Sequence, residues 1–461
     1  MHTTESKNKT KINILIVMHS AGMGGVEKSI RTLCKYINRE RFNLTAALPC
    51  EGPLSFELKD MGVNTIITPI DTWTPVSFNF GERHYYQFLA ALKNRIERLA
   101  AIITENNIDL VHSSTLSVAD GAFAARFAHV PHIWHIHGKS IGTTNSYGVY
   151  ISVKTLYSLA ASLSDCIAAV SNDVDRFLQQ YIKCEPPCVV YNGMDINEFD
   201  ALASLPTSLR EEFQLNDKKL VMLVGRLEEV KGIEDYVQSA IKVLSKRNDA
   251  AFIIAGRYED KELSERIRSF VSAKGLANSI VFTGARNDIP AMLRESDIFV
   301  CSSKTEGFSY AVLEAMAAAK PVVTTRCGGP EEMVIHKETG LHVDVGMPEQ
   351  IAEALHMLLD NKQMREDMGR KGRKTAEQKF NAEIYARNFE DIYMRFSCKR
   401  ERKAPNPWGE VMLGMASNIG DLGMRIRHLE HEVRDLRSFE SIFKDNCIYQ
   451  GLKNLRKIFK K

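Results

Sequence analysis

The amino-acid sequence predicts an α/β fold in which two βαβ domains face each other across a cleft. Three observations support this expectation. The 461 residues are too many for one hydrophobic core. Short apolar runs alternate with amphipathic stretches, as they do in parallel βαβ units. The alternation pauses at a polar segment, 195–217, which we interpret as a hinge, and then starts again.

The first half contains apolar runs with the length and β-branched content of buried strands. Two amphipathic stretches, 26–38 and 84–106, have the helical spacing of apolar residues and lie between these runs. A last strand, 189–193, ends in a turn. The other strand candidates are 12–18, 43–48, 109–112, 132–135 and 166–170. We therefore expect the first domain at 1–195.

The second half repeats the pattern with five more apolar runs, and helical stretches continue to residue 395. The strand candidates are 220–225, 251–256, 279–283, 298–302 and 321–324. We expect a second βαβ domain at 196–380, a helix at 381–396 and a helical extension at 397–461. The sequence Pro-Asn-Pro-Trp-Gly at 405–409 cannot continue a helix and separates the extension from what precedes it.

Composition is that of an ordinary globular protein and gives no sign of nucleic-acid binding. Apolar residues make up 44% and charged residues 25% of the chain, and its formal charge is +3. Nine cysteines without a CxxC pair fit a reducing compartment, and we expect Cys184 and Cys188 to be structural thiols rather than metal ligands. Neither a signal peptide nor an apolar run of about 18 residues is evident, which predicts a cytoplasmic protein.

Two carboxylates at a strand-to-helix junction are the most informative feature of the chain. Residues 297–303 predict a buried strand, and 310–320 predict a helix. Glu306 therefore lies in a loop at the carboxyl end of a strand, where open α/β sheets bind ligands, and Glu314 lies in the helix. Carboxylate oxygens can accept hydrogen bonds from sugar hydroxyls, although a helix-face ion pair is an alternative for Glu314. The helix opens with backbone N–H donors from Gly307, Phe308 and Ser309.

Two cations follow another predicted strand. Arg226 comes directly after the strand, and Lys231 follows before a helix that begins near residue 233. A guanidinium and an ammonium in one loop can neutralise a diphosphate without a metal ion. Ion pairs with Glu228 and Glu229 in a solvated turn are the alternative.

A glycine loop and a histidine occur at strand ends in the first half. Gly24 and Gly25 open a helix, where the backbone can approach an anion closely, although a simple tight turn is also compatible. His135 and His137 fall on one side of a predicted strand. We favour an imidazole of His137 that hydrogen-bonds to substrate over a structural histidine. The two histidines could instead be a pair of metal ligands, but no acidic third ligand stands nearby.

A short acidic motif has a simpler interpretation than metal binding. Asp173 and Asp175 match the spacing of a metal-binding DxD motif. They begin a predicted helix with Ser171 or Asn172 as its cap. We therefore expect these carboxylates to pair with the helix dipole.

These motifs, in this order, resemble the glycosyltransferase group 1 family, the retaining enzymes of glycosyltransferase family 4 with the GT-B fold. The resemblance covers roughly residues 10–396. The matching segments are Gly24-Gly25, His137-Gly138, Tyr191-Asn192-Gly193-Met194-Asp195, Gly225-Arg226 with Lys231-Gly232, Val281-Phe282-Thr283-Gly284, Glu306-Gly307-Phe308 with Glu314, Gly328-Gly329-Pro330-Glu331-Glu332 and Thr339-Gly340.

The resemblance implies two Rossmann-like domains that close on a nucleotide-sugar held mainly by the second domain. Arg226 and Lys231 would bind its diphosphate, with Gly25 reaching across from the first domain. Glu314 would hold the ribose, and Glu306 would hold the hydroxyls of the transferred sugar. His137 would contact that sugar or the acceptor. The remaining substrate contacts would come from Gly24, Gly307, Phe308 and Ser309, and helix 381–396 would pack back on the first domain.

The implied reaction is transfer of a hexosyl-type sugar with retention of configuration to a glycan or lipid-linked acceptor, in cell-surface polysaccharide biosynthesis. The departing diphosphate would take the acceptor's proton, and no metal or other cofactor is expected. UDP is the nucleotide that we expect in the donor, and GDP and ADP stay open as alternatives. A sugar-nucleotide epimerase of the same fold and a catalytically silent nucleotide-sugar-binding scaffold are the alternatives.

The extension 397–461 lies outside the family pattern and is basic. It carries 14 Lys and Arg against 8 Asp and Glu, a net charge of +6. Basic amphipathic helices can dock on an anionic membrane, where a lipid-linked acceptor would be found, and this would place the protein on the inner face of the membrane. A partner-binding appendage is the alternative.

Truncation at Ser397 is therefore expected to remove most binding to anionic liposomes, because it deletes this basic charge. Co-sedimentation of the truncated and full-length chains measures the difference. Equal binding of the two chains would rule out the membrane role.

Overall fold

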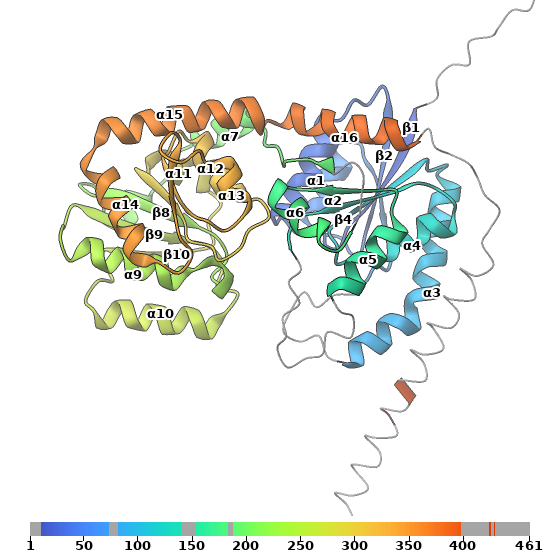
Figure 1. The fold of residues 1–461 in the computed structure, drawn as a ribbon, viewed down its shortest axis with the longest axis horizontal. Helices are drawn as coiled ribbons and strands as arrows, with labels where there is room; N and C mark the ends of the chain where they lie inside the picture. Colours follow the sequence, from blue (N-terminus) through green and yellow to red (C-terminus); the bar gives the residue numbers. More distant parts are fainter. Residues whose placement is uncertain are drawn as a thin grey trace, which may run out of the picture.

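The computed structural model describes residues 11–72, 82–139, 153–182 and 188–397, together with positions 424, 425 and 428. These residues form two parallel sheets with helices packed on their faces (Figure 1). The predicted α/β class with two domains is confirmed. The predicted extension beyond residue 397 and Cys184 lie outside the described residues, apart from the three isolated positions.

The first sheet has the strand order β3-β2-β1-β4-β5-β6-β7, and all of its pairings are parallel. We call the part of the chain that forms it the first domain. Its strands are β1 (Ile12–Val17), β2 (Phe42–Leu48), β3 (Asn64–Ile67), β4 (Leu110–Ser114), β5 (His132–Ile136), β6 (Cys166–Ala169) and β7 (Cys188–Val189). Its helices are α1 (Gly25–Tyr36), α2 (Pro53–Asp60), α3 (Glu82–Glu105), α4 (Asp120–Phe127), α5 (Val153–Leu163) and α6 (Asn172–Gln179).

The second sheet has the order β10-β9-β8-β11-β12-β13 and is also parallel; its part of the chain is the second domain. Its strands are β8 (Lys219–Val224), β9 (Ala250–Ala255), β10 (Ile280–Gly284), β11 (Ile298–Cys301), β12 (Val322–Thr325) and β13 (Gly340–Val343). Its helices are α7 (Ile196–Ala203), α8 (Leu209–Glu212), α9 (Ile233–Leu244), α10 (Lys261–Ala273), α11 (Ile289–Glu295), α12 (Tyr310–Ala317), α13 (Gly329–Met333), α14 (Pro348–Asp360) and α15 (Lys362–Lys379).

Two edge strands and the helices of the expected hinge were not predicted. Strand β3 is partly exposed along its whole length, so it lacks the apolar run that marks a buried strand. Strand β13 begins at Gly340 and has four residues. The segment 195–217 contains α7 and α8, and α7 packs on α11 and α12 of the second domain.

Strand order determines where each sheet can bind a ligand. In both sheets the order reverses beside the first strand, between β1 and β4 and between β8 and β11. Loops at the carboxyl ends of strands leave an open crevice at such a switch point. Each domain therefore offers one crevice.

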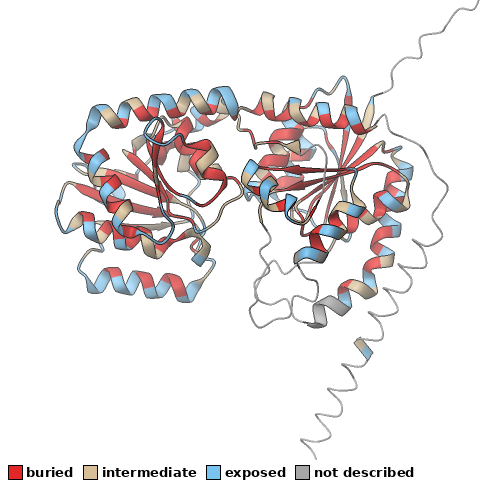
Figure 2. Ribbon diagram, viewed as in Figure 1, coloured by how far each residue is buried: buried red, intermediate tan, exposed pale blue. Residues whose placement is uncertain are grey.

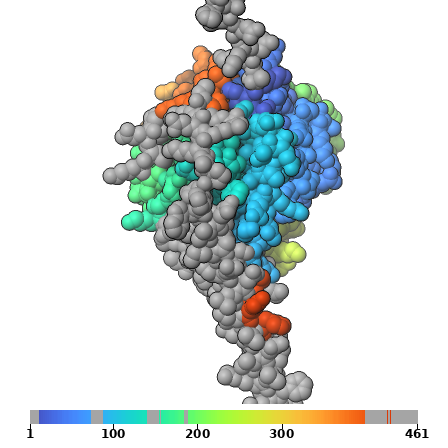
Figure 3. All heavy atoms as spheres, turned by 90° about the vertical axis from the view of Figure 1, so that its right-hand side faces the viewer, coloured from blue at the N-terminus to red at the C-terminus, as the bar shows by residue number. Residues whose placement is uncertain are grey.

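The chain crosses between the domains twice, and the two crossings are bonded to each other. The Met194 amide donates to the Phe380 carbonyl at 2.9 Å, and the Ala382 amide donates to the Met194 carbonyl at 3.0 Å. After the second crossing, helix α16 (Ala382–Ser397) lies along the first domain beside α1 (Figure 1). In Figure 3, orange atoms from the late part of the described chain lie beside the blue atoms of its N-terminal part. Its buried aromatic residues Tyr385, Phe389 and Tyr393 share a core with β1 and β2.

Burial follows the layers of the fold. The strands are buried along most of their length, whereas the helices bury one face and expose the other (Figure 2). Within the described residues, no helix combines the length and hydropathy needed to cross a bilayer.

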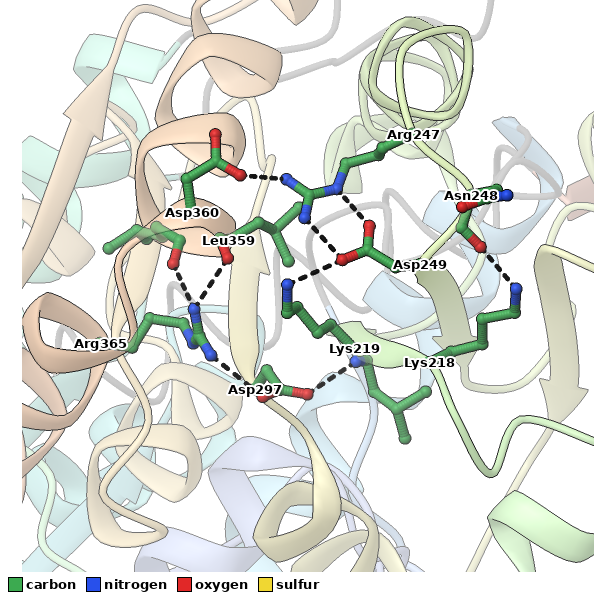
Figure 4. A network of polar contacts seen from close by, with 11 residues as sticks. Lys218, Lys219, Arg247, Asn248, Asp249, Asp297, Leu359, Asp360 and Arg365 are labelled. Carbon is green, nitrogen blue, oxygen red and sulfur yellow. Dashed lines mark hydrogen bonds and ion pairs between the residues drawn. The ribbon is translucent and has the colours of Figure 1, made fainter.

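A charged network closes the amino-terminal edge of the second sheet, which is the edge opposite its crevice (Figure 4). Arg247 donates to both carboxylate oxygens of Asp249, at 2.6 and 2.8 Å, and also contacts Asp360 at 2.8 Å. Lys219 adds a bond of 2.7 Å to Asp249. These bonds hold the pKa of the Asp249 carboxyl below its usual range.

Replacement of Asp249 by Asn is expected to lower the free energy of unfolding by about 1 kcal/mol at neutral pH, the scale of a well-formed surface network. The folded-state pKa of Asp249 lies below the unfolded value of about 3.9, so its contribution is present above that pH and is lost as the pH falls through the folded value. Thermal unfolding of both proteins against pH measures this. If the difference in Tm between the two proteins stayed constant as the pH fell well below about 3.9, the predicted role of the Asp249 carboxylate would be contradicted.

Candidate functional site

The crevices of the two domains face each other, because the loops after β5 and β11 are in backbone contact. A Cβ atom added to Gly307 would lie 2.1 Å from the His137 carbonyl oxygen and 2.9 Å from the Gly138 Cα. No larger residue fits at position 307 in this arrangement. The glycine loop before α1 also reaches the second domain, since a Cβ on Gly25 would lie 3.5 Å from the Tyr310 ring. Gly24, beside it, forms the N-cap of α1.

The loop between β8 and α9 is fixed against the end of β11, and this positions Lys231. Gly232 has a φ of +61°, and a Cβ there would lie 2.0 Å from the Ser302 carbonyl oxygen. The Ser302 hydroxyl donates to the Lys231 carbonyl at 2.9 Å, and the Lys304 amide donates to the Val230 carbonyl at 2.7 Å. A glycine in the left-handed region thus allows the close approach of two loops.

Lys231 and Glu306 form an ion pair at the base of the crevice. Lys231 Nζ lies 2.5 Å from Glu306 Oε1, and the Ser303 hydroxyl donates to the same oxygen at 2.9 Å. Only 22% and 13% of the two side chains are exposed. Burial alone would lower the pKa of the Lys231 ammonium, but the Glu306 carboxylate outweighs burial and the pKa is raised. Lys231 therefore stays charged at neutral pH.

Arg226 lies in the same loop but contacts neither member of this pair directly. Its Nη2 atom lies 2.9 Å from Glu228 Oε1, and 55% of its side chain is exposed. This is one of the ion pairs that the sequence analysis gave as the alternative to phosphate binding. The guanidinium is thus accessible at the surface of the loop. Its predicted contact with a diphosphate stays a prediction.

Glu314 is buried in α12 and pairs with the opposite domain. The Ser309 hydroxyl caps this helix by accepting from the Val312 amide at 3.4 Å, which places Glu314 in the second turn. The Glu314 carboxylate accepts a 2.6 Å hydrogen bond from Lys28 Nζ of α1. Sequence reasoning missed Lys28. Its position one turn after Gly25 was the only hint in the sequence that it lies near the cleft. The partner of a lysine on a helix surface becomes evident only when the opposite domain is in place.

The side chains of Phe308 and Ser309 have structural contacts. Phe308 is buried, and its ring packs edge-on against Phe380 at 5.8 Å between centroids. Ser309 is the cap of α12. Their predicted contacts with a substrate stay predictions.

His137 is half-buried in the cleft and is held in the neutral state. Its Nε2 lies 3.2 Å from the Ser114 hydroxyl. The centres of the His137 and His135 rings are 3.9 Å apart, so the two side chains lie on the same side of the strand, as predicted. Burial, with smaller effects from His112 and His19, lowers the pKa of His137 to about 3. A neutral imidazole can both donate and accept a hydrogen bond.

The acidic motif at the start of α6 joins the two domains. Ser171 is the cap and accepts from the Val174 amide at 3.3 Å, as one of the two predicted possibilities. Glu332 of the second domain accepts from the amides of Asn172 at 2.9 Å and Asp173 at 2.6 Å. This use of Glu332 was not foreseen. Among the described residues, no group of three or more His, Cys, Asp or Glu could hold a metal ion.

The arrangement offers cations, carboxylates and backbone N–H groups on facing walls of one cleft. Lys231 and Arg226 can stabilise an anion such as a phosphate. Glu306 and Glu314 can accept hydrogen bonds from hydroxyls at two separate places. These groups suit a ligand that carries both charged and hydroxylated parts.

Comparison with known proteins identifies two adjacent matches to family sequence models. Residues 23–198 match the model "Glycosyltransferase Family 4", and residues 207–375 match "Glycosyl transferases group 1". Among curated relatives, N-acetyl-alpha-D-glucosaminyl L-malate synthase from Bacillus anthracis is 24% identical over 302 residues, which cover 64% of this chain and 77% of that protein. The capsular polysaccharide biosynthesis glycosyltransferase CapM from Staphylococcus aureus is 30% identical over 215 residues, covering 46% of this chain and 55% of that protein.

Solved structures share the fold. Anabaena Alr3699/HepE, crystallised in complex with UDP, superposes with a TM-score of 0.69 at 21% identity, covering 83% of this chain and all of that one. A further structure of the same protein contains UDP-glucose, with a TM-score of 0.68 at 22% identity. The expected GT-B arrangement of two facing Rossmann-like domains is confirmed. Across five curated relatives, the two named above among them, the matched regions span 55% to 81% of the length of the relative.

The low pKa predicts that His137 does not titrate between about pH 5 and 8, the range in which an ordinary histidine changes charge. NMR of imidazole-labelled protein measures this directly. The His137→Gln variant identifies the signal by its loss. A titration of that signal near pH 6.5 would contradict the lowered pKa of His137.

Proposed function

The chain belongs to the glycosyltransferase group 1 family, and on this basis we propose that it transfers a hexosyl-type sugar from a UDP-sugar to a glycan or lipid-linked acceptor, with retention of configuration. The product would be part of a cell-surface polysaccharide or glycoconjugate. The observation that carries the proposal is the buried Lys231–Glu306 pair at the carboxyl end of the second sheet. This pair sets an ammonium, a group that can bind phosphate, beside a carboxylate, a group that can accept hydrogen bonds from hydroxyls.

The donor is proposed from the chemistry of the cleft and from the complexes of a structural neighbour. Lys231 and Arg226 provide two positive charges for a diphosphate, and the α1 N-terminus opens toward the same cleft at Gly25. The HepE structures contain UDP and UDP-glucose, which supports uracil as the base. Glu314 would accept from the ribose hydroxyls and Glu306 from the sugar hydroxyls.

The acceptor is proposed from the names of relatives and from the basic extension. CapM acts in capsular polysaccharide biosynthesis, which supports a glycan product. A lipid-linked acceptor lies at a membrane surface, and a basic extension could bring the enzyme there. The site of action would then be the cytoplasmic face of the membrane.

Catalysis would depend on stabilising the leaving group. The bond between the sugar C1 and the diphosphate oxygen breaks, and the acceptor oxygen bonds to C1 on the same face. The acceptor's proton passes to an oxygen of the departing diphosphate, so no carboxylate base is required. Lys231 and Arg226 would stabilise the charge that develops on the diphosphate, and fixed charges in a water-poor site are effective in this role. His137 would orient the sugar or the acceptor hydroxyl as a neutral hydrogen-bonding group.

Lys231→Ala and Glu306→Ala are each expected to lower kcat/KM for sugar transfer by about 100-fold or more, because each removes a charged contact made in the transition state. UDP release in the presence of acceptor measures the rate. Lys242→Ala is the matched control, since Lys242 pairs with Glu349 at 2.9 Å on the outer helices α9 and α14. Unchanged transfer by both site variants would refute the assignment, and formation of an epimer without acceptor would favour the epimerase.

A further inference from the structure

Lys28 crosses the cleft to reach the carboxylate proposed for the ribose. It lies in the first turn of α1 and its Nζ is 2.6 Å from Glu314 Oε1 of α12. The same ammonium lies 6.0 Å from the centre of the Tyr310 ring. Because Gly25 packs on that ring, the beginnings of α1 and α12 are held against each other. The ion pair therefore exists only while the two domains are together.

The two members of this pair differ in exposure, and the difference indicates which one depends on the other. The Lys28 side chain is 44% exposed, whereas the Glu314 side chain is 11% exposed. A lysine at the surface can be solvated by water, but a buried carboxylate is costly to ionise without a partner. Glu314 therefore depends on Lys28 for its hydrogen bond and its orientation more than Lys28 depends on Glu314.

A carboxylate held in this way keeps the capacity to bind a ligand. It has two oxygens, each able to accept more than one hydrogen bond. With Oε1 bonded to Lys28, the second oxygen can accept from a vicinal diol. A lysine on the first oxygen also fixes the plane of the carboxylate, which determines where that second acceptor points.

We propose that Lys28 is a positioning residue for nucleotide recognition: from the first domain it holds the carboxylate of Glu314 in the second domain oriented for the ribose hydroxyls. The inference rests on the proposed function, in which Glu314 binds ribose. It adds that ribose recognition is built from both domains, so that a ribonucleotide is held best when the cleft is closed. A purely structural strut between the domains would affect all nucleotides alike.

The test compares UDP with 2′,3′-dideoxy-UDP, which lacks the diol but keeps the base and diphosphate. Calorimetric titration is done with the full-length wild-type chain and with Lys28→Met, Lys28→Arg and Glu314→Gln. The wild type is expected to prefer UDP by about tenfold or more, the scale of a hydrogen bond to a charged group. Lys28→Met should remove most of that preference while leaving the affinity for dideoxy-UDP nearly unchanged. Lys28→Arg should retain the preference for UDP, because it keeps a positive charge at this position.

The matched control is Lys35→Met on the same helix. Lys35 pairs with Asp195 at 2.6 Å and Glu198 at 2.7 Å, away from Glu314. This variant should keep the wild-type preference, and unfolding temperatures of all variants confirm that they fold.

Two results overturn the inference alone. In the first, the wild type prefers UDP, and Lys28→Met keeps the same preference or binds UDP more tightly. This result would show that Lys28 does not act through the ribose. Equal weakening of both nucleotides by Lys28→Met would show a strut between domains. A wild type that binds both nucleotides equally, with Glu314→Gln indistinguishable from it, would instead refute the ribose role of Glu314 and the inference with it.

Discussion

The backbone contact between Gly307 and the His137–Gly138 segment is the constraint on which the rest of the site depends. It brings the loop after β11 against the loop after β5, so that the carboxyl edges of two separate sheets form one cleft. A side chain at position 307 would force the loops apart. Two other contacts also hold the domains together. They are the hydrogen bonds between the crossings at Met194 and Phe380, and the contact of Glu332 with α6.

Within this frame, the charges of the cleft are arranged so that each is compensated before a ligand arrives. Lys231 pairs with Glu306 inside the second domain, and Lys28 pairs with Glu314 between the domains. The side chains of Lys231, Glu306 and Glu314 are mostly buried, so any of these three charges would be costly without its partner. A nucleotide-sugar that offers a diphosphate to the cations and hydroxyls to the carboxylates could engage both kinds of charge at once. The groups that compensate one another within the protein are therefore also the groups that suit the proposed ligand.

Local sequence patterns predicted the two-domain class and most buried strands, because apolar runs and glycine turns are local signals. They also placed Glu306, Lys231 and His137 at strand ends, and the structure has them there. Contacts between distant segments were beyond such reasoning. Neither the bond of Lys28 to Glu314 nor that of Glu332 to α6 has a local signature, since each partner is an ordinary helix residue until the domains meet. Strand β3 was missed for a different reason: its exposure leaves no apolar run.

The proposed function requires the carboxyl edge of the second sheet to bind a nucleoside diphosphate. The most direct measurement is the thermal stability of the wild-type chain with UDP, GDP and ADP, alongside Lys231→Ala. A nucleotide present at about 100 times its Kd should stabilise the wild type by about 2.7 kcal/mol. We expect a rise in Tm with UDP that is largely lost in the Lys231→Ala variant. No rise with any of the three nucleotides, or an equal rise in the variant, would contradict it.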